Sequence, residues 1–178
     1  FNNPDGMRID LDTQFNGSYA GQTLITPARH DFQVGINGSM MRMKLSTIPG
    51  HEAVELFPTI EVAPINPRTA AYLDHNAVPI QFTNEDFDQV DAGNYVTKVI
   101  YLPDPEFQDL ALANVETLVS TRLDPGDDPI VEADRRGSIM AILRMGNKVQ
   151  FPMTAPAASP AAYYPGMMPQ QAMMGTPP

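Results

Sequence analysis

Apolar and polar residues alternate in several short runs along the chain, as they do in strands that are buried on one face. In residues 7–12, Met7, Ile9 and Leu11 share one face and three charged residues share the other. Residues 41–45 repeat this pattern with basic outer residues. Residues 54–62 repeat it again, but Pro58 interrupts the run, which is typical of an edge strand or a bulge. These runs predict half-buried strands.

Residues 95–102 are β-branched or aromatic nearly throughout, which predicts a central strand covered on both faces. Residues 115–123 and 138–144 complete the predicted strands. Asn16 and Asn37 each begin an Asn-Gly-Ser sequence, which is formally an N-glycosylation acceptor. Because Asn-Gly is equally the commonest hairpin turn signal, we interpret both as turns.

Three short helices are predicted from capping residues between the strands. Residues 83–93 begin with a capping box formed by Thr83 and Asp86 and end at a glycine. Residues 104–106 and residues 128–129 each place an acidic cap before proline, and Gly137 is expected to stop the last helix. Strands outnumber these connectors. We therefore expect a mainly β fold, an antiparallel β-sandwich of Ig-like or jelly-roll-like type with short capping helices.

The composition changes after Lys148. Residues 152–178 carry no charge and contain seven prolines and five methionines, so they have too few large core residues to fold alone. We predict a β-sandwich domain over residues 1–149 and an extended tail over residues 150–178. The tail would dock on its own domain or on a neighbouring copy through adaptable aromatic and methionine side chains: Tyr163, Tyr164, Met167, Met168, Met173 and Met174.

Composition and charge exclude several classes of function. The formal net charge of −10 would repel nucleic acid and anionic lipid surfaces. The chain has no cysteine, which excludes disulfides, thiolate zinc sites and cysteine nucleophiles. No apolar run approaches the ~20 residues of a membrane-spanning helix. We therefore expect no nucleic-acid partner and no transmembrane segment.

The residues that could carry chemistry are sparse. His30, His51 and His75 show no metal-ligand or catalytic spacing, so surface or turn positions are expected. Asp124, Asp127 and Asp128 form an oxygen-rich turn that could hold Ca²⁺, although a turn followed by a helix cap explains the same residues. A further acidic group has the composition of a glycosidase carboxylate pair, but a solvated helix face accounts for it: Glu85, Asp86, Asp88 and Asp91. We expect no enzyme and no cofactor.

Six blocks stand out in order between residues 30 and 147: residues 42–50, 54–62, 78–83, 99–105, 118–126 and 135–139. Together they resemble a family of uncharacterised secreted or cell-envelope proteins of planctomycete bacteria. The resemblance implies export and an extracellular or envelope location, and it brings no activity and no catalytic residues. A first residue of Phe1 is consistent with a processed chain or with a trimmed sequence.

Two roles follow. The leading hypothesis is a structural subunit of an extracellular or cell-envelope assembly, such as a filament, in which the termini of one copy are ordered by another. Its partners would be other copies of the chain. The alternative is a monomeric binding module displayed on the envelope, with a glycan, Ca²⁺ or a partner protein as ligand.

Overall fold

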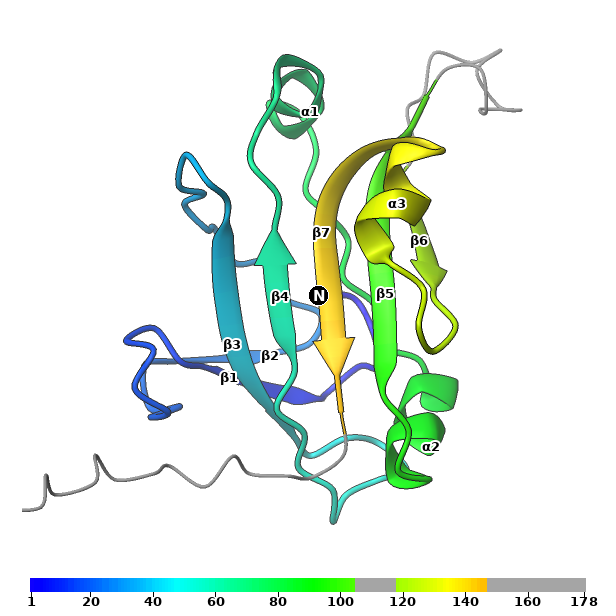
Figure 1. Ribbon diagram of the computed structural model, residues 1–178. Coiled ribbons are helices and arrows are strands. Elements are labelled where there is room, and N and C mark those ends of the chain that lie inside the picture. Colours follow the sequence, from blue (N-terminus) through cyan, green and yellow to red (C-terminus); the bar gives the residue numbers. More distant parts are fainter. Residues whose placement is uncertain (105–117, 147–178) are drawn as a thin grey trace, which may run out of the picture.

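The computed structural model describes residues 1–104 and 118–146. Within these residues, seven strands form one antiparallel sheet in the order β2-β1-β3-β4-β7-β5-β6 (Figure 1). The predicted mainly β class is confirmed. The strands are β1 (Arg8–Leu11), β2 (Gln22–Ile25), β3 (Ser39–Ser46), β4 (Thr59–Val62), β5 (Val96–Pro103), β6 (Val119–Arg122) and β7 (Gly137–Met145).

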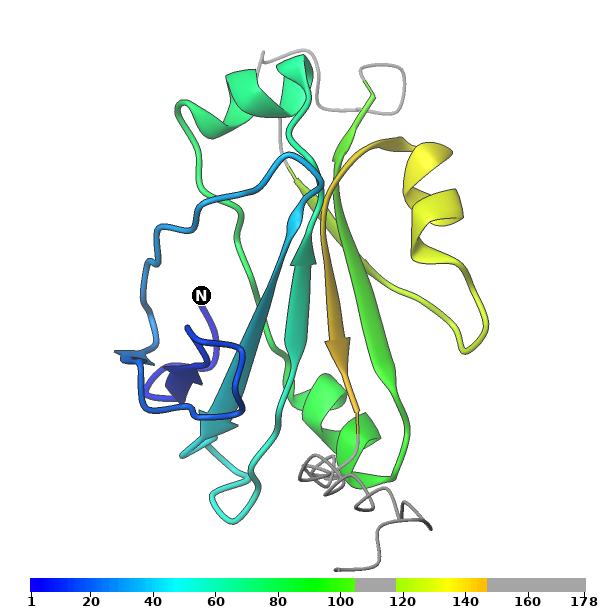
Figure 2. The same ribbon diagram turned by 60° about the vertical axis from the view of Figure 1, so that its left-hand side comes forward.

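Strand β3 belongs to both halves of the sheet and makes it bend. Its first half, residues 39–42, pairs with β4, whereas its second half, residues 43–46, pairs with β1. The β1–β2 ribbon consequently runs across the direction of β4, β7 and β5 (Figures 1 and 2). The described residues form this one bent sheet, and the predicted sandwich is not confirmed by it.

The hydrophobic core lies on the side of the sheet that the β1–β2 ribbon covers. Met7, Ile9 and Leu11 are fully buried there with residues of β4, β5 and β7 and with the aromatic rings of Phe82 and Phe87. Val99, Tyr101, Ala133 and Ile142 form a smaller cluster on the opposite side, beneath α3 (Pro129–Asp134). The central strand predicted at residues 95–102 is therefore covered on both faces, as expected.

The prediction for residues 7–12 is wrong in one respect, because Asp10 and Asp12 are buried and not solvated. Asp10 accepts hydrogen bonds from Arg8 Nε at 2.8 Å and from the Thr23 hydroxyl. Asp12 accepts hydrogen bonds from the backbone N–H groups of Asn16 and Gly17 at 3.2 and 2.9 Å. These donors lie on β1 itself, on β2 and in the intervening loop. A period-two pattern contains no information about them.

Two of the predicted helices are confirmed by their caps. Helix α2 (Asn84–Asp91) begins at the predicted capping box of Thr83 and Asp86, and Gly93 follows it with a left-handed φ of 92°. Helix α3 begins with Asp128 as its cap and Pro129 in its first turn. The helix predicted from residues 104–106 extends into residues that lie outside the description.

Helix α1 (Pro67–Leu73) was not predicted, although its start carries a usable signal. Asn66 caps the helix, Pro67 is its first residue, and Asn66 and Thr69 form a reciprocal capping box. Helix α3 ends at Asp134 with Arg135 as its C-cap, so the expected stop at Gly137 is wrong. Gly137 has no left-handed φ. It begins β7, where a Cβ would collide with the Leu102 carbonyl.

Candidate functional site

An open apolar groove lies on the core side of the sheet, beside α1. Its volume is about 560 Å³, within the range of roughly 300–1,000 Å³ that is usual for ligand pockets. The floor is the sheet itself: Met41 of β3, Ile60 and Val62 of β4, and Met140 and Ala141 in the middle of β7. Strand alternation places Ile60 and Val62 of β4 on the core side, and a register shift in β7 brings the consecutive residues Met140 and Ala141 to that same side.

Three segments form the walls of the groove. Phe32 and Val34 come from the connection between β2 and β3, Leu73 comes from α1, and Val78 comes from the connection between α1 and α2. Figure 2 shows these connections beside β3 and β4, with α1 at one end. No wall residue is close in sequence to the floor of β7. The groove is thus a product of tertiary structure.

Backbone hydrogen bonds from the first residues fasten two of the walls together. Asn2 N–H donates to the Ile80 carbonyl at 3.1 Å, and Ala28 N–H donates to the Phe1 carbonyl at 2.9 Å. A parallel bridge joins Asn3 to Gln81. Because residues 1–3 lie between the two connections and bond to both, the walls hold their spacing through main-chain contacts.

The third wall, α1, is fixed to the end of β5. The Arg68 guanidinium donates to the Asp104 carboxylate and to the Pro103 carbonyl. The Asn66 side chain accepts from Thr69 N–H at 2.9 Å and so satisfies the first turn of the helix. Leu73 is thereby held over the apolar floor.

The groove has little electrostatic character of its own. Among its lining residues, Arg29 and Asp31 are the charged side chains, and they pair with each other at 3.3 Å on the exposed rim. His30 also lines the groove, and its ring lies near the ring of Phe32. This lining suits an uncharged apolar ligand, and it brings no nucleophile and base together within the described residues.

The structure separates the three histidines. His30 lies at the groove, and His75 is exposed just after α1. His51 contacts α2, with Nδ1 at 3.0 Å from Asp91 Oδ2 and Nε2 at 3.6 Å from Asp88 Oδ1. Within the part of the chain that the structure describes, no group of three or more His, Asp and Glu side chains is placed to hold a metal ion.

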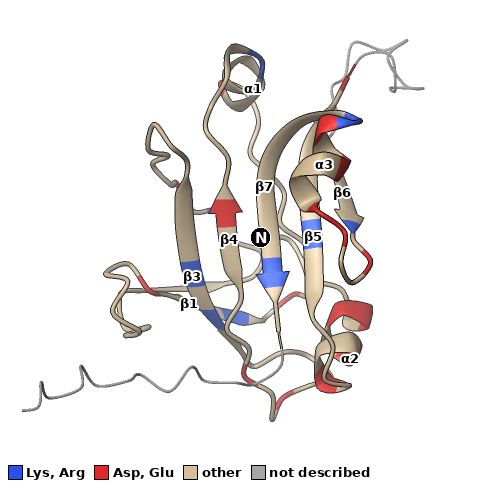
Figure 3. Ribbon diagram, viewed as in Figure 1, with Lys and Arg blue, Asp and Glu red and all other residues tan. Residues whose placement is uncertain are grey.

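The acidic turn before α3 is built as a turn with a helix cap. Asp127 N–H donates to the Asp124 carbonyl at 3.1 Å, and the Asp128 side chain accepts from Ile130 N–H at 2.9 Å. One of the three candidate Ca²⁺ ligands therefore has a capping role. Figure 3 shows that acidic residues gather on this turn and on α2 and α3.

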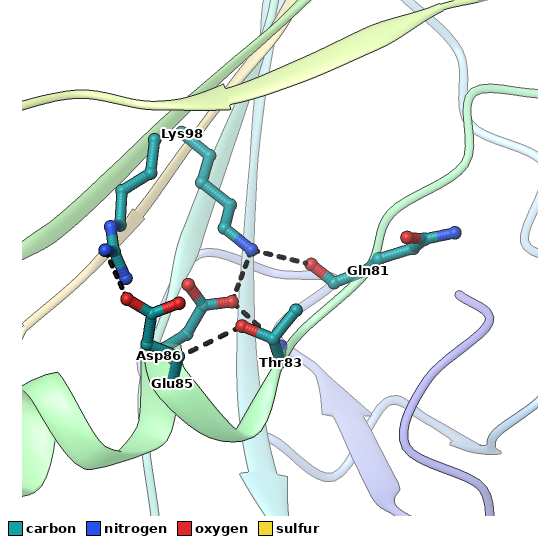
Figure 4. A network of polar contacts seen from close by, with 6 residues as sticks. Gln81, Thr83, Glu85, Asp86 and Lys98 are labelled. Atoms are coloured by element: carbon teal, nitrogen blue, oxygen red, sulfur yellow. Dashed lines mark hydrogen bonds and ion pairs between the residues drawn. The ribbon is translucent and has the colours of Figure 1, made fainter.

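The second acidic group contains a buried charged pair that sequence reasoning missed. Lys98 Nζ, on β5, bonds to Asp86 Oδ2 of α2 and lies 3.3 Å from the Gln81 carbonyl (Figure 4). Asp86 Oδ2 also accepts from Thr83 N–H at 2.8 Å. Asp86 is 1% exposed, and its Oδ1 has no hydrogen-bond partner among the described residues. A lysine in the middle of an apolar strand was the available signal.

The polar network of Gln81, Thr83, Asp86 and Lys98 links a helix to the central sheet. It joins α2 to β5, and beside it Arg122 of β6 pairs with Glu85 at 2.5 Å. The pKa of Arg122 is raised further above its ordinary value by the hydrogen bond to Glu85. None of the four residues of this network lines the apolar groove, and their contacts attach α2 to β5.

The predicted self-assembly residues, Tyr163 to Met174, lie outside the described residues. The last described residue, Gly146, lies against the Tyr95 ring, and a Cβ at position 146 would collide with that ring. None of the helices described here is both long enough and apolar enough to span a membrane.

Comparison with known proteins gives no match: no family model, no curated protein and no solved structure is similar to the chain. The resemblance to planctomycete envelope proteins therefore stays a prediction that rests on the sequence blocks. The function has to be argued from the groove and from the chemistry of the chain.

Proposed function

We propose that the chain is a non-enzymatic structural subunit of an extracellular or cell-envelope assembly, and that it binds other copies of itself through the apolar groove. The observation that carries this proposal is the groove, an open apolar surface continuous with the core. Apolar surface that stays accessible on a folded domain is typical of an interaction site. The envelope location rests on the sequence resemblance alone.

The charge of the chain favours an uncharged contact between copies. With a net charge of −10, two copies repel each other over the acidic surfaces of α2 and α3. The groove lacks acidic residues apart from Asp31, which Arg29 neutralises. An interface placed there avoids the like-charge repulsion and gains from apolar burial.

We also propose that the fold is a β-sandwich. We infer that the β1–β2 ribbon and the second half of β3 act as the second layer of a small β-sandwich. Ile9 and Leu11 of β1 share one core cluster with Ile60 of β4 and Leu143 of β7, as facing layers would. Such a two-layer body would give an assembly a rigid repeating unit.

Light scattering on the full chain tests the self-association. We expect particles larger than a monomer, and we expect Ile65→Glu to reduce them to monomers, because Ile65 lines the groove and is 51% exposed. Ile130→Glu is the matched control, since Ile130 is 53% exposed on α3 and does not line the groove.

A monomeric full chain at all concentrations would contradict the proposal. It would favour the second role, a monomeric module whose groove binds a segment of a partner protein. Equal effects of Ile65→Glu and Ile130→Glu would show that assembly occurs elsewhere on the surface.

A further inference from the structure

We propose that the groove of one copy is occupied by the tail, residues 150–178, of a second copy. This inference rests on the proposed self-assembly and names the segment that makes the contact. Tail and groove would form a head-to-tail interface, in which every copy contributes one groove and one tail.

The chemistry of the tail matches the chemistry of the groove. The tail contains no charged residue, and it is the longest part of the chain without one. Its methionine pairs and its Tyr163-Tyr164 pair supply flexible and aromatic side chains that suit an irregular apolar floor. A charged segment would instead leave ionised groups against Ile60, Val62 and Met140, at a large desolvation penalty.

Proline also favours a groove over a sheet edge as the acceptor. The tail has seven prolines between residues 152 and 178, and proline has no N–H group to donate to a strand ladder. An extended proline-rich segment loses less conformational entropy on binding, because its backbone is already restricted. A groove lined by apolar side chains takes such a segment without main-chain pairing.

The path of β7 places the exit of the tail away from the groove of the same copy. The floor of the groove includes Met140 and Ala141 in the middle of β7, and the strand ends at Met145. Strand geometry puts residue 146 about 20 Å from residue 140 along the sheet. The chain leaves at the end where β5 begins, close to Tyr95.

The surface between this exit and the groove is already covered. Met7 and Ile9 of the β1 region, together with Phe82 and Phe87, are fully buried against that side of the sheet. A tail that returned to its own groove would have to reverse direction and pass around these elements. The length is sufficient for either route, since 32 residues span about 100 Å when extended. The groove of a second copy is reached without the reversal.

Cysteine cross-linking tests the contact directly, because the chain has no cysteine of its own. A full chain carrying Ile65→Cys is mixed with a size-tagged full chain carrying Met168→Cys and is oxidised under mild conditions. We expect a disulfide-linked heterodimer at a yield several-fold above that of the matched pair Ile130→Cys with Met168→Cys. Both Ile65 and Ile130 are about half exposed, so general reactivity is matched.

Two results would overturn the inference. One is an equal yield from the Ile65→Cys and Ile130→Cys mixtures. The other is a chain carrying both Ile65→Cys and Met168→Cys that links only within itself in dilute solution, which would place the tail in its own groove. A full chain with Met167→Asp and Met168→Asp provides a second measurement, and we expect it to be monomeric in light scattering.

The same measurements separate this inference from the proposed function. If the unmodified chain forms particles that Ile65→Glu abolishes but Met167→Asp with Met168→Asp does not, the groove mediates assembly with another occupant. Only the inference about the tail then fails. If the unmodified chain is a monomer, both fail.

Discussion

At the scale of single residues, each buried carboxylate among the described residues accepts hydrogen bonds from at least two donors. Asp10 and Asp12 receive donors from β1, β2 and the loop between them, and Asp86 receives donors from Thr83 and Lys98. The two cases differ, because the hydrogen-bonding capacity of Asp86 is only partly used among the described residues. A buried ion pair of this kind adds little net stability, but the loss of one partner is costly because it leaves the other charge buried and unpaired.

Substitutions at the Lys98–Asp86 pair should reveal this cost. Lys98→Met leaves a buried carboxylate without its cation, and we expect it to lower the free energy of unfolding by about 3–5 kcal/mol in urea denaturation. The double change Lys98→Met with Asp86→Asn removes both charges and should lose clearly less. Arg144→Ala, which breaks the half-exposed pair with Glu61, should cost under about 1 kcal/mol. Additive losses at the buried pair would argue against coupling.

Asp10 gives a pH dependence with a definite sign. The hydrogen bond from Arg8, aided by Thr23 and opposed by burial, lowers the pKa of the Asp10 carboxyl below its ordinary value. The ionised form therefore stabilises the folded chain above the unfolded pKa of about 3.9. This contribution is lost as the pH falls through the folded pKa. The stability difference between the native chain and Asp10→Asn should be constant near neutral pH and shrink in acid. A difference that grows in acid would show the opposite shift.

At the scale of elements, local signals account for most of the strands and for two helices. Period-two alternation predicted the runs that contain β1, β3 and β4, β-branched and aromatic content predicted β5, and capping residues predicted α2 and α3. Strand β2 was missed because Gln22–Ile25 is short and has no apolar alternation. Helix α1 was missed because its capping box uses Asn66 and Thr69, a pairing less familiar than one that ends in an acid.

The candidate site could not be predicted from the sequence. Its floor comes from three strands and its walls come from three further segments, and no local pattern states which of them meet. In the sequence, Phe32 and Val78 are apolar residues between predicted elements, and nothing near them indicates that they line a common groove. The tail was found from composition alone, because the absence of charge over residues 152–178 is visible without any structure.

The contribution of the Thr83 N-cap of α2 to the free energy of unfolding should be measurable. Thr83→Ala removes the oxygen that accepts from Asp86 N–H and should lower the free energy of unfolding by about 1 kcal/mol. Thr83→Ser keeps the acceptor and should lose much less. The comparison is made by urea denaturation of the full chain. Equal losses for the two variants would mean that the methyl group, and not the cap, is responsible.

At the scale of the whole molecule, an acidic body and an uncharged tail imply a distinctive response to salt. The net charge of −10 opposes contact between copies, whereas the proposed interface is apolar. Salt screens the repulsion and leaves apolar burial intact. The response to salt therefore distinguishes an apolar interface, which salt favours here, from an interface of ion pairs, which salt weakens.

Particle size by light scattering should therefore increase as the ionic strength rises from about 0.02 to about 0.5 M, where the Debye length falls to a few Å. Ile130→Glu should follow the same curve, and Ile65→Glu should remain small throughout. Particles that dissolve as salt is added would indicate an interface of ion pairs, contrary to the proposed groove.

The position of β7 in the sheet has a mechanical consequence. The tail continues from a strand that lies between two neighbours, pairing with β4 on one side and along its whole length with β5 on the other. A pull on the tail would load both ladders in shear, so that many backbone hydrogen bonds resist together. An edge strand such as β6 would resist through one ladder only. If neighbouring subunits are joined through this tail, a pulling force on the assembly would act on a strand that is hydrogen-bonded on both sides.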